Sequence, residues 1–260
     1  MIYEDIFNTK IESVGCIPHD TYPFIGASPD GINIDPSSKL YGRLLEIKNV
    51  KSRKIDGIVS KPYWVQTQIQ MEVCNLNECD FLETKFIEYD NYNAYINENF
   101  DKIPEPNNFD EIVEDDSTTN STKSSVISEC KYNYIGVILY FYKLDEPPCY
   151  VYQPLHLKTL YDIQTWEEQK KIEYESTGYQ WITNYYWKLS VFNCVLILRN
   201  QFWFNSSVTD ITKFWNIIQE ERITGYEHRA PNSKKKVNSI LNDVILVDKT
   251  IVDDTLVDDK

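Results

Sequence analysis

The sequence has no long hydrophobic run, although 42% of its 260 residues are hydrophobic and 14% are aromatic. A helix that spans a bilayer needs about 20 consecutive apolar residues. The best candidate, 134–142, has nine residues of mainly β-branched and aromatic types, which indicates a buried strand. Residues 1–10 contain acids and no apolar block, so no secretory signal is expected. We therefore expect a soluble protein in the cytoplasm (of a host cell, if the source is viral) with no membrane partner.

Several short motifs are also missing. The six cysteines form no C-x-x-C pair, so a zinc ribbon or an iron–sulfur site is not supported and buried thiols are expected. The histidines at 19, 156 and 228 lack ligand spacing, and no glycine-rich phosphate loop suggests ATP use. Trp203, Trp215 and the aromatic run 185–187 are interpreted as core residues rather than as platforms for stacked bases.

The net charge of −14 argues against nucleic acid as a partner, because phosphate contacts need lysine and arginine. The charge is unevenly distributed, however. Residues 39–61 contain seven basic and two acidic residues, whereas the acids gather at 101–116 and 243–259. A basic segment of this kind is often only a solvated loop, but it also allows an acidic protein to bind a phosphodiester locally.

Hydrophobic patterning predicts two groups of elements around a gap. In 1–100, the motif-rich core, we expect a strand at 11–16, a strand at 44–50, a helix at 63–74 with Pro62 in its first turn, and a strand at 81–89. Residues 101–130 are expected to be a flexible acidic insertion. Residues 131–230 are expected to continue the same domain. They are expected to form a hairpin of 134–143 and 149–153, a helix at 160–174 and a strand at 191–200. A last helix is expected at 211–222, with Asp210 as its N-cap and Gly225 at its end. The charged tail, 231–260, is expected to be partly disordered.

Three short strings contain the residues suited to chemistry. They are Gly-Ala-Ser-Pro-Asp-Gly at 26–31, Leu-Leu-Glu-Ile-Lys at 44–48, and Tyr-Trp-Val-Gln-Thr-Gln-Ile-Gln-Met at 63–71. Phosphodiester hydrolysis needs a divalent metal that neutralises the phosphate and lowers the pKa of an attacking water molecule. Mg²⁺ prefers oxygen ligands and keeps several waters. Asp30 at a turn, Glu46 on a strand and the carbonyl of Ile47 would provide such ligands if the two strands pair as a hairpin.

Lys48 lies two residues after Glu46, so both side chains leave the same face of the expected strand. An ammonium group there can orient the water, stabilise developing charge or take a proton. Each string alone has an ordinary explanation, since Pro-Asp-Gly is a common turn and Glu-x-Lys is usually a solvated charge pair. The residues around Glu46 are largely apolar, however, and a charge inside such a strand needs a partner or a metal.

In this order, the three strings resemble the core motifs of the YqaJ-like viral recombinases, which are relatives of lambda exonuclease in the PD-(D/E)XK nuclease superfamily. The resemblance covers about 11–90. It implies an α/β (α+β) fold with a restriction-endonuclease-like core, a mixed central β-sheet flanked by helices. It also implies a Mg²⁺-dependent deoxyribonuclease, with Mn²⁺ as an alternative metal, that digests duplex DNA ends in the 5′→3′ direction during viral-type recombination or DNA processing.

The same resemblance implies roles for individual residues. Asp30, Glu46 and the backbone carbonyl of Ile47 would bind metal, Lys48 would be the catalytic lysine, and Gln66 would support them by hydrogen bonding. The expected DNA contacts are Ser28, Lys51, Arg53, Tyr63 and Gln68. Because Gln68 and Gln70 alternate around the helix, at least one is expected to be structural. DNA is the expected partner, and a homo-oligomer and a single-strand annealing or recombination partner are also considered.

One family feature is not found. The family has a further acid in a Gly-x-x-x-Glu helix, and the chain is expected to begin just after it, with Glu4 and Glu12 as candidate substitutes. The alternative hypothesis is therefore a catalytically inactive module, derived from that family, that binds DNA or docks a partner. A structure-specific endonuclease on the same scaffold is a third hypothesis.

Overall fold

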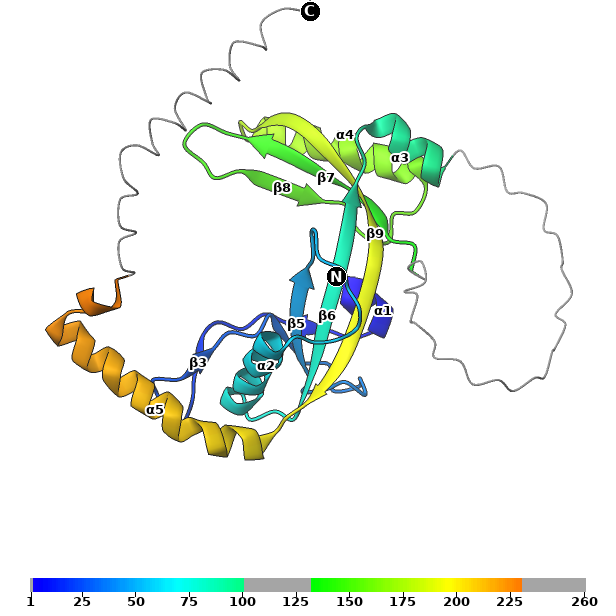
Figure 1. Ribbon diagram of the computed structural model, residues 1–260. Coiled ribbons are helices and arrows are strands. Elements are labelled where there is room, and N and C mark those ends of the chain that lie inside the picture. The colour runs from blue at the N-terminus through cyan, green and yellow to red at the C-terminus, as the bar shows by residue number, and fades with distance from the viewer. Residues whose placement is uncertain (1, 101–131, 231–260) are drawn as a thin grey trace, which may run out of the picture. The chain divides into compact units, whose positions relative to one another are not determined.

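The computed structural model describes residues 2–100 and 132–230. Contacts divide the chain into two compact units, Met1–Ser206 and Ser207–Lys260. All the strands of the described residues lie in the first unit (Figure 1). The insertion and the charged tail expected from the sequence lie outside the described residues.

The first unit is built on a seven-stranded sheet in which β6 and β9 lie side by side (Figure 1). In spatial order its strands are β1 (Ile11–Glu12), β4 (Gly31–Asn33), β5 (Leu44–Asn49), β6 (Glu78–Glu88), β9 (Gln180–Leu198), β7 (Ile135–Tyr142) and β8 (Cys149–Tyr152). A separate two-stranded sheet pairs β2 (Ile17–Pro18) with β3 (Gly26–Ala27). Among the described strands, only the β5–β6 pair is parallel, so the predicted mixed sheet is confirmed.

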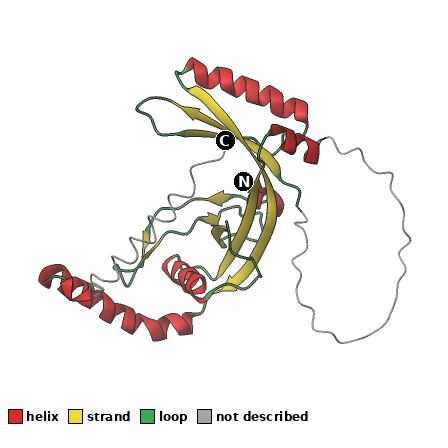
Figure 2. Cartoon of the chain, turned by 45° about the horizontal axis from the view of Figure 1, so that its top comes forward, coloured by secondary structure: helices red, strands yellow, loops and turns green. Residues whose placement is uncertain are grey.

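Helices α1 (Ile2–Phe7), α2 (Lys61–Val73), α3 (Tyr92–Asn99) and α4 (Leu160–Ser176) pack against this sheet (Figure 2). After β9 come α5 (Gln201–Thr224), most of which belongs to the second unit, and the 3₁₀ turn η1 (Glu227–Arg229). Parallel neighbours such as β5 and β6 need a crossover connection, and α2 is that connection. It starts where predicted, with Pro62 in its first turn, where a missing N–H has no cost. None of the described helices is long and apolar enough to cross a membrane.

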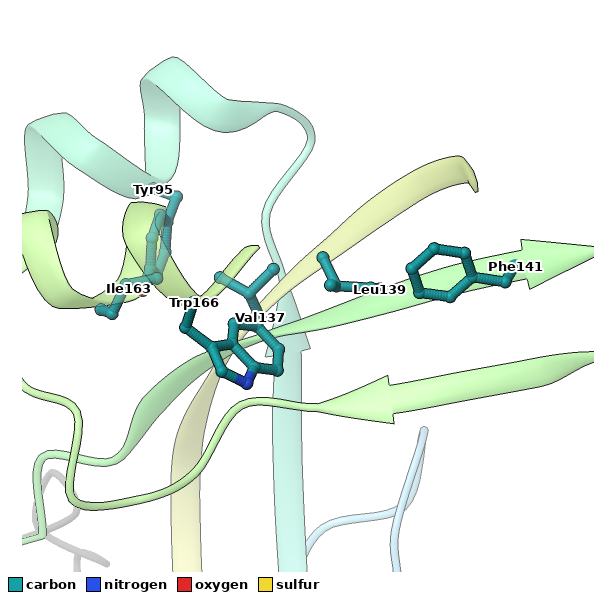
Figure 3. Close-up of a cluster of buried hydrophobic side chains, with 6 residues drawn as sticks. All are labelled: Tyr95, Val137, Leu139, Phe141, Ile163 and Trp166. Carbon is teal, nitrogen blue, oxygen red and sulfur yellow. The ribbon is translucent and has the colours of Figure 1, made fainter. Parts of the chain in front are cut away.

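Three hydrophobic clusters hold the first unit together. Leu44, Met71 and Phe81 join α2 to one face of the sheet. Tyr3, Leu45 and Leu82 join α1 to the opposite face, because successive strand residues point to opposite sides. The third cluster, drawn in Figure 3, packs Tyr95 of α3 and Ile163 and Trp166 of α4 against Val137, Leu139 and Phe141 of β7.

Most of the predicted elements are confirmed: the strands at 44–50 and 81–89, the helices at 63–74 and 160–174, and the hairpin of β7 and β8. The strand expected at 11–16 is wrong beyond its first two residues, because only Ile11 and Glu12 pair with β4. The helix expected at 211–222 begins ten residues earlier. Asn200, not Asp210, caps it through a hydrogen bond from Trp203 N to its Oδ1 (2.9 Å). Gly225 ends it as predicted, with φ of 92°.

The strand expected at 191–200 is the second half of β9, which is 19 residues long. β9 pairs with β6 along 187–198 and with β7 along 180–188. Register shifts between Lys85 and Phe86 and between Tyr140 and Phe141 bend these pairs. The single strand therefore connects the part of the sheet that contains β5 and α2 with the part that contains the hairpin, α3 and α4 (Figure 1).

Candidate active site

Glu46 is a charged group in the interior of the protein. It lies in β5 with 2% of its surface exposed, between the buried Leu45 and the half-buried Ile47. A buried carboxylate is costly unless donors surround it, and Glu46 has three. Its Oε1 contacts Lys48 Nζ and accepts a hydrogen bond from Gln66 Nε2 (2.7 Å), while its Oε2 accepts one from Gln70 Nε2 (2.6 Å).

The two glutamines reach Glu46 because of the helical repeat of α2. Residues four positions apart lie on the same face of a helix, so Gln66 and Gln70 both point toward β5. Met71 of the same helix is fully buried against the sheet, which fixes the distance between α2 and the strand. The crossover helix thus supplies the amide groups that make a buried carboxylate tolerable.

Asp30 reaches the same strand from the neighbouring hairpin. Gly31 pairs with Leu45 in the antiparallel β4–β5 ladder, so the register continued by one residue places Asp30 opposite Glu46. The Asp30 carboxylate accepts a hydrogen bond from the backbone N–H of Ile47 (2.7 Å). Since the N–H and C=O of one strand residue point to the same edge, the carbonyl of Ile47 faces the side on which Asp30 lies. Asp30 itself is exposed.

These groups suit a hard divalent cation. A carboxylate has about four acceptor positions, and three donors occupy those of Glu46, so one is left. Gln70 Oε1 is buried and has no hydrogen-bond partner among the described residues, which leaves a further acceptor near the carboxylate for a water molecule or an ion. Within 2–100 and 132–230, no three side chains of the types His, Cys, Asp and Glu gather as a ready metal site. A cation here would therefore depend on the Ile47 carbonyl and on water for its other ligands.

Cations also surround Tyr63, at the start of α2. Lys48 Nζ lies 5.2 Å and Arg53 Cζ 5.7 Å from the centre of its ring, within the range of cation–π attraction. Arg53 also contacts the buried Glu83, and that hydrogen bond raises the pKa of the guanidinium. The Tyr63 ring packs on Phe81 at 5.4 Å. The result is a basic, aromatic rim beside the buried carboxylate.

The structure does not bring every predicted residue to this place. Gln68 is 1% exposed, and its amide bonds to backbone, donating to Leu198 O (3.0 Å) and accepting from Asn200 N (2.6 Å). Its assignment as a DNA contact is thus corrected, because it faces β9 and α5 rather than Glu46. Gln70, which was given no role from the sequence, donates to Glu46, and its four-residue spacing from Gln66 is the sequence signal that identifies it. Ser28 and Lys51 are exposed.

A cavity of about 370 Å³ lies on the α1 side of this strand. Asp30, Ile47 and Ser13 line it together with Glu4 of α1. Glu4 Oε1 accepts a hydrogen bond from Ile11 N (3.0 Å). Of the two acids considered as substitutes, Glu4 therefore shares a cavity with Asp30, whereas Glu12 does not line it.

The comparisons with known proteins agree with the motifs. Residues 1–77 match the family model described as YqaJ-like viral recombinase domain, so the resemblance inferred from the three strings is confirmed. Uncharacterized protein R354 of Acanthamoeba polyphaga mimivirus is 31% identical over 239 residues, which are 84% of this chain and 41% of that protein. The chain thus spans less than half the length of that relative.

Two solved structures are also similar over part of the chain. The crystal structure of an alkaline exonuclease (LHK-Exo) from Laribacter hongkongensis is 31% identical, and the match covers 32% of this chain and 43% of that one with a TM-score of 0.27. The structure of LHK-Exo in complex with dAMP is 30% identical and covers 32% and 42% of the two chains, with a TM-score of 0.26.

Proposed function

We propose that this protein is a metal-dependent DNA nuclease that digests duplex ends from 5′ to 3′ in viral-type recombination or DNA processing. One observation carries the proposal: the Asp30 carboxylate, just before β4, accepts a hydrogen bond from the N–H of Ile47 in β5, and the residues on either side of Ile47, Glu46 and Lys48, contact each other through their side chains. The family match over 1–77 supports it independently.

Asp30, Glu46 and the Ile47 carbonyl would hold Mg²⁺, or Mn²⁺ in its place. When bound, the metal neutralises phosphate charge and lowers the pKa of a water molecule. Lys48 can hold a proton next to that water, because its Nζ contacts Glu46. In hydrolysis the water oxygen bonds to phosphorus, the bond from phosphorus to the leaving oxygen breaks, and that oxygen takes up a proton. Gln66 and Gln70 are positioning residues that fix the direction of the Glu46 carboxylate.

The DNA backbone would lie along the basic rim. Tyr63 and Arg53 lie beside Lys48, and Ser28 and Lys51 are exposed. These four are our proposed DNA contacts. The proposal includes assembly of the protein into a homo-oligomer and cooperation with a single-strand annealing partner. It also includes action in the cytoplasm.

The decisive experiment compares the wild-type chain with Glu46→Gln and Lys48→Ala on end-labelled linear duplex with Mg²⁺. We expect digestion by the wild type and a loss of about 100-fold or more in each variant, because each removes a group that acts on the reacting atoms. Glu168→Gln, on the exposed side of α4, is the matched control and should digest normally. Equal digestion by all four proteins would refute the proposal. An exonuclease should leave circular duplex intact, because it needs an end, whereas an endonuclease should cut it.

A second candidate is an inactive DNA-binding or partner-docking module. It is favoured by the finding that, in the described part of the chain, no third acidic, histidine or cysteine side chain joins Asp30 and Glu46 as a ligand set. Calorimetry decides between the two. Uptake of Mg²⁺ or Mn²⁺ that Asp30→Asn abolishes supports the enzyme, whereas DNA binding without metal uptake or cleavage supports the module.

A further inference from the structure

Glu83 is a second buried carboxylate on the face of the sheet that carries Glu46. It lies in β6 with 1% of its surface exposed, directly opposite Lys48 in the parallel β5–β6 ladder. Residues opposite each other in a ladder point to the same face of the sheet. Glu83 therefore points to the α2 side, as Phe81 does two residues earlier. The hydrolysis described above makes no use of this carboxylate.

Two side chains donate hydrogen bonds to Glu83. Arg53, from the loop between β5 and α2, donates from Nη2 to Oε1, and Asn193 of β9 donates from Nδ2 to Oε2 (3.3 Å). The pair of Glu83 and Arg53 is buried unequally, because the side chain of Glu83 is 2% exposed and that of Arg53 is 42% exposed. The sheet thus fixes the carboxylate, while the guanidinium reaches the solvent.

The guanidinium lies beside the proposed catalytic lysine. Arg53 Cζ and Lys48 Nζ lie 5.7 and 5.2 Å from the centre of the same ring, that of Tyr63. The loop that carries Arg53 is anchored two residues later by Ile55, which is 3% exposed. A phosphate of DNA that is bound at Lys48 would therefore have Arg53 as a neighbouring cation on the same face.

Contact with a fixed carboxylate prepares an arginine for phosphate. A free arginine side chain loses much rotamer entropy when it is immobilised, and a group held in place beforehand avoids part of that cost on binding. A guanidinium has five N–H donors, so an arginine that donates to one carboxylate keeps further donors for phosphate oxygens. Burial of Glu83 also keeps its negative charge away from the surface that the phosphate would approach.

We propose that Glu83 is a positioning residue for substrate binding, which acts through Arg53 by holding the guanidinium beside Tyr63 and Lys48, where it binds a phosphate of the DNA strand. Glu83 itself contacts neither DNA nor metal. The inference rests on the proposed function and divides this face of the sheet into two ion pairs. Glu46 and Lys48 act on the reacting atoms, whereas Glu83 and Arg53 hold the substrate.

The test is a double-mutant cycle on DNA binding, measured in EDTA so that it does not depend on cleavage. Fluorescence anisotropy with labelled duplex compares the wild type, Glu83→Gln, Arg53→Ala and the double variant. Glutamine keeps the shape of Glu83 and removes its charge. If Glu83→Gln does not fold by thermal melting, Glu83→Asp takes its place in the cycle, because the shorter side chain keeps the charge and withdraws it from Arg53.

Glu72→Gln is the matched control. Glu72 Oε2 also accepts a hydrogen bond from an arginine, Arg199 Nε (2.9 Å), and both side chains are largely buried. This pair lies at the opposite end of α2 from Tyr63. Loss of an ion pair between glutamate and arginine is therefore common to both variants, and only the position beside Lys48 differs.

We expect Glu83→Gln to weaken duplex binding about fivefold and Arg53→Ala about tenfold, since each disturbs a charge-assisted contact with phosphate. The double variant should bind no more weakly than Arg53→Ala, because Glu83 acts only through Arg53. Glu72→Gln should bind like the wild type. In digestion with Mg²⁺, Glu83→Gln should raise KM about fivefold and change kcat less than about twofold.

Additive losses in the folded variants would overturn the inference, because they would show that Glu83 acts independently of Arg53. Wild-type affinity in Glu83→Gln or in Arg53→Ala would also overturn it, as would a fall in kcat without a rise in KM. Failure of the wild type to bind duplex would do so whatever the digestion assay shows. If Glu46→Gln and Lys48→Ala digest DNA normally while the cycle is not additive, the proposed catalytic site fails and the positioning role stands.

Discussion

At the scale of single residues, the three glutamines of α2 show how position decides role. Gln66, Gln68 and Gln70 are chemically identical and two residues apart. Gln66 and Gln70 both donate to Glu46, while Gln68, on the other side of the helix, bonds to the backbone of Leu198 and Asn200. Gln66 and Gln70 therefore act on the candidate site, whereas Gln68 holds the end of β9 against α2.

This difference predicts opposite phenotypes. Gln68→Ala should lower the free energy of unfolding by about 2 kcal/mol, because it leaves a carbonyl and an N–H of the backbone without partners in a buried place. Gln66→Ala removes a half-buried side chain and should cost less than about 1 kcal/mol, but it should reduce nuclease activity. Urea unfolding followed by circular dichroism measures the first quantity, and a digestion assay the second. Equal destabilisation by both changes would contradict the division of roles.

The sequence predicts Asp30, Glu46 and Lys48 as site residues from local features, namely a turn, a two-residue spacing and an apolar strand, and their roles stay a prediction. It was not sufficient to choose between Gln68 and Gln70. That choice depends on which face of α2 lies against β5, and long-range packing decides it.

At the scale of elements, α4 buries a carboxylate against the sheet. Glu167 is 9% exposed, and its Oε2 accepts a hydrogen bond from Asn184 Nδ2 of β9 (2.9 Å). Burial raises the pKa of this carboxyl, although Lys171 and Asn184 partly oppose the shift. Burial between helix and sheet therefore stabilises the neutral form of Glu167 relative to the charged form, compared with an exposed carboxyl.

The pH dependence of stability follows from that shift. Because the folded-state pKa is above the unfolded value, the folded protein holds the proton more tightly. Stability associated with Glu167 is complete below the ordinary carboxyl pKa of about 4.5 and declines as pH rises through the folded value. Glu167→Gln should abolish this decline and melt at a higher temperature than wild type at neutral pH. Glu175→Gln, exposed on the same helix, is the control. A parallel pH profile for wild type and Glu167→Gln would disprove the link.

The secondary-structure elements were predicted correctly where the hydrophobic pattern and the positions of turn residues agreed. The strand at 44–50 and the hairpin of β7 and β8 have apolar residues bounded by turn residues. The first half of β9 was missed because residues 181–187, Trp-Ile-Thr-Asn-Tyr-Tyr-Trp, show no regular alternation of apolar and polar side chains. Its pairing with β7 makes it a strand. The early start of α5 was missed because Asn200 and Asp210 are equally good caps in the sequence, and the contact of Gln68 with Asn200 N distinguishes them.

At the scale of the whole molecule, the charge is −14 and the proposed substrate is a polyanion. Three of the seven basic residues in 39–61 are occupied within the protein: Arg43 by Glu78 and Asp80, Lys48 by Glu46, and Arg53 by Glu83. Lys39, Lys51, Lys54 and Lys61 are exposed. These four lysines, together with Arg53, whose side chain is 42% exposed beside Glu83, are the cations accessible to phosphate in this segment.

Binding of duplex DNA should accordingly depend only moderately on salt. The slope of log affinity against log salt is expected to be about −4, since each phosphate contact contributes about −0.9. Lys51→Ala/Lys54→Ala should reduce the magnitude of the slope by about 2. Fluorescence anisotropy with labelled duplex in EDTA measures it. A wild-type slope near −8, unchanged in the double variant, would show that basic residues outside this segment bind the DNA.

The double pairing of β9 makes the two ends of the sheet one cooperative unit. Its first half pairs with β7 and its second half with β6, and Trp187 and Lys188 pair with both strands. Unfolding of the hairpin end therefore frays the same strand that covers β6. Amide protons of β6 and β9 should consequently exchange slowest and at similar rates. A chain that stopped before 180 would expose one side of β6 as a free edge, with an open ladder that other chains could extend.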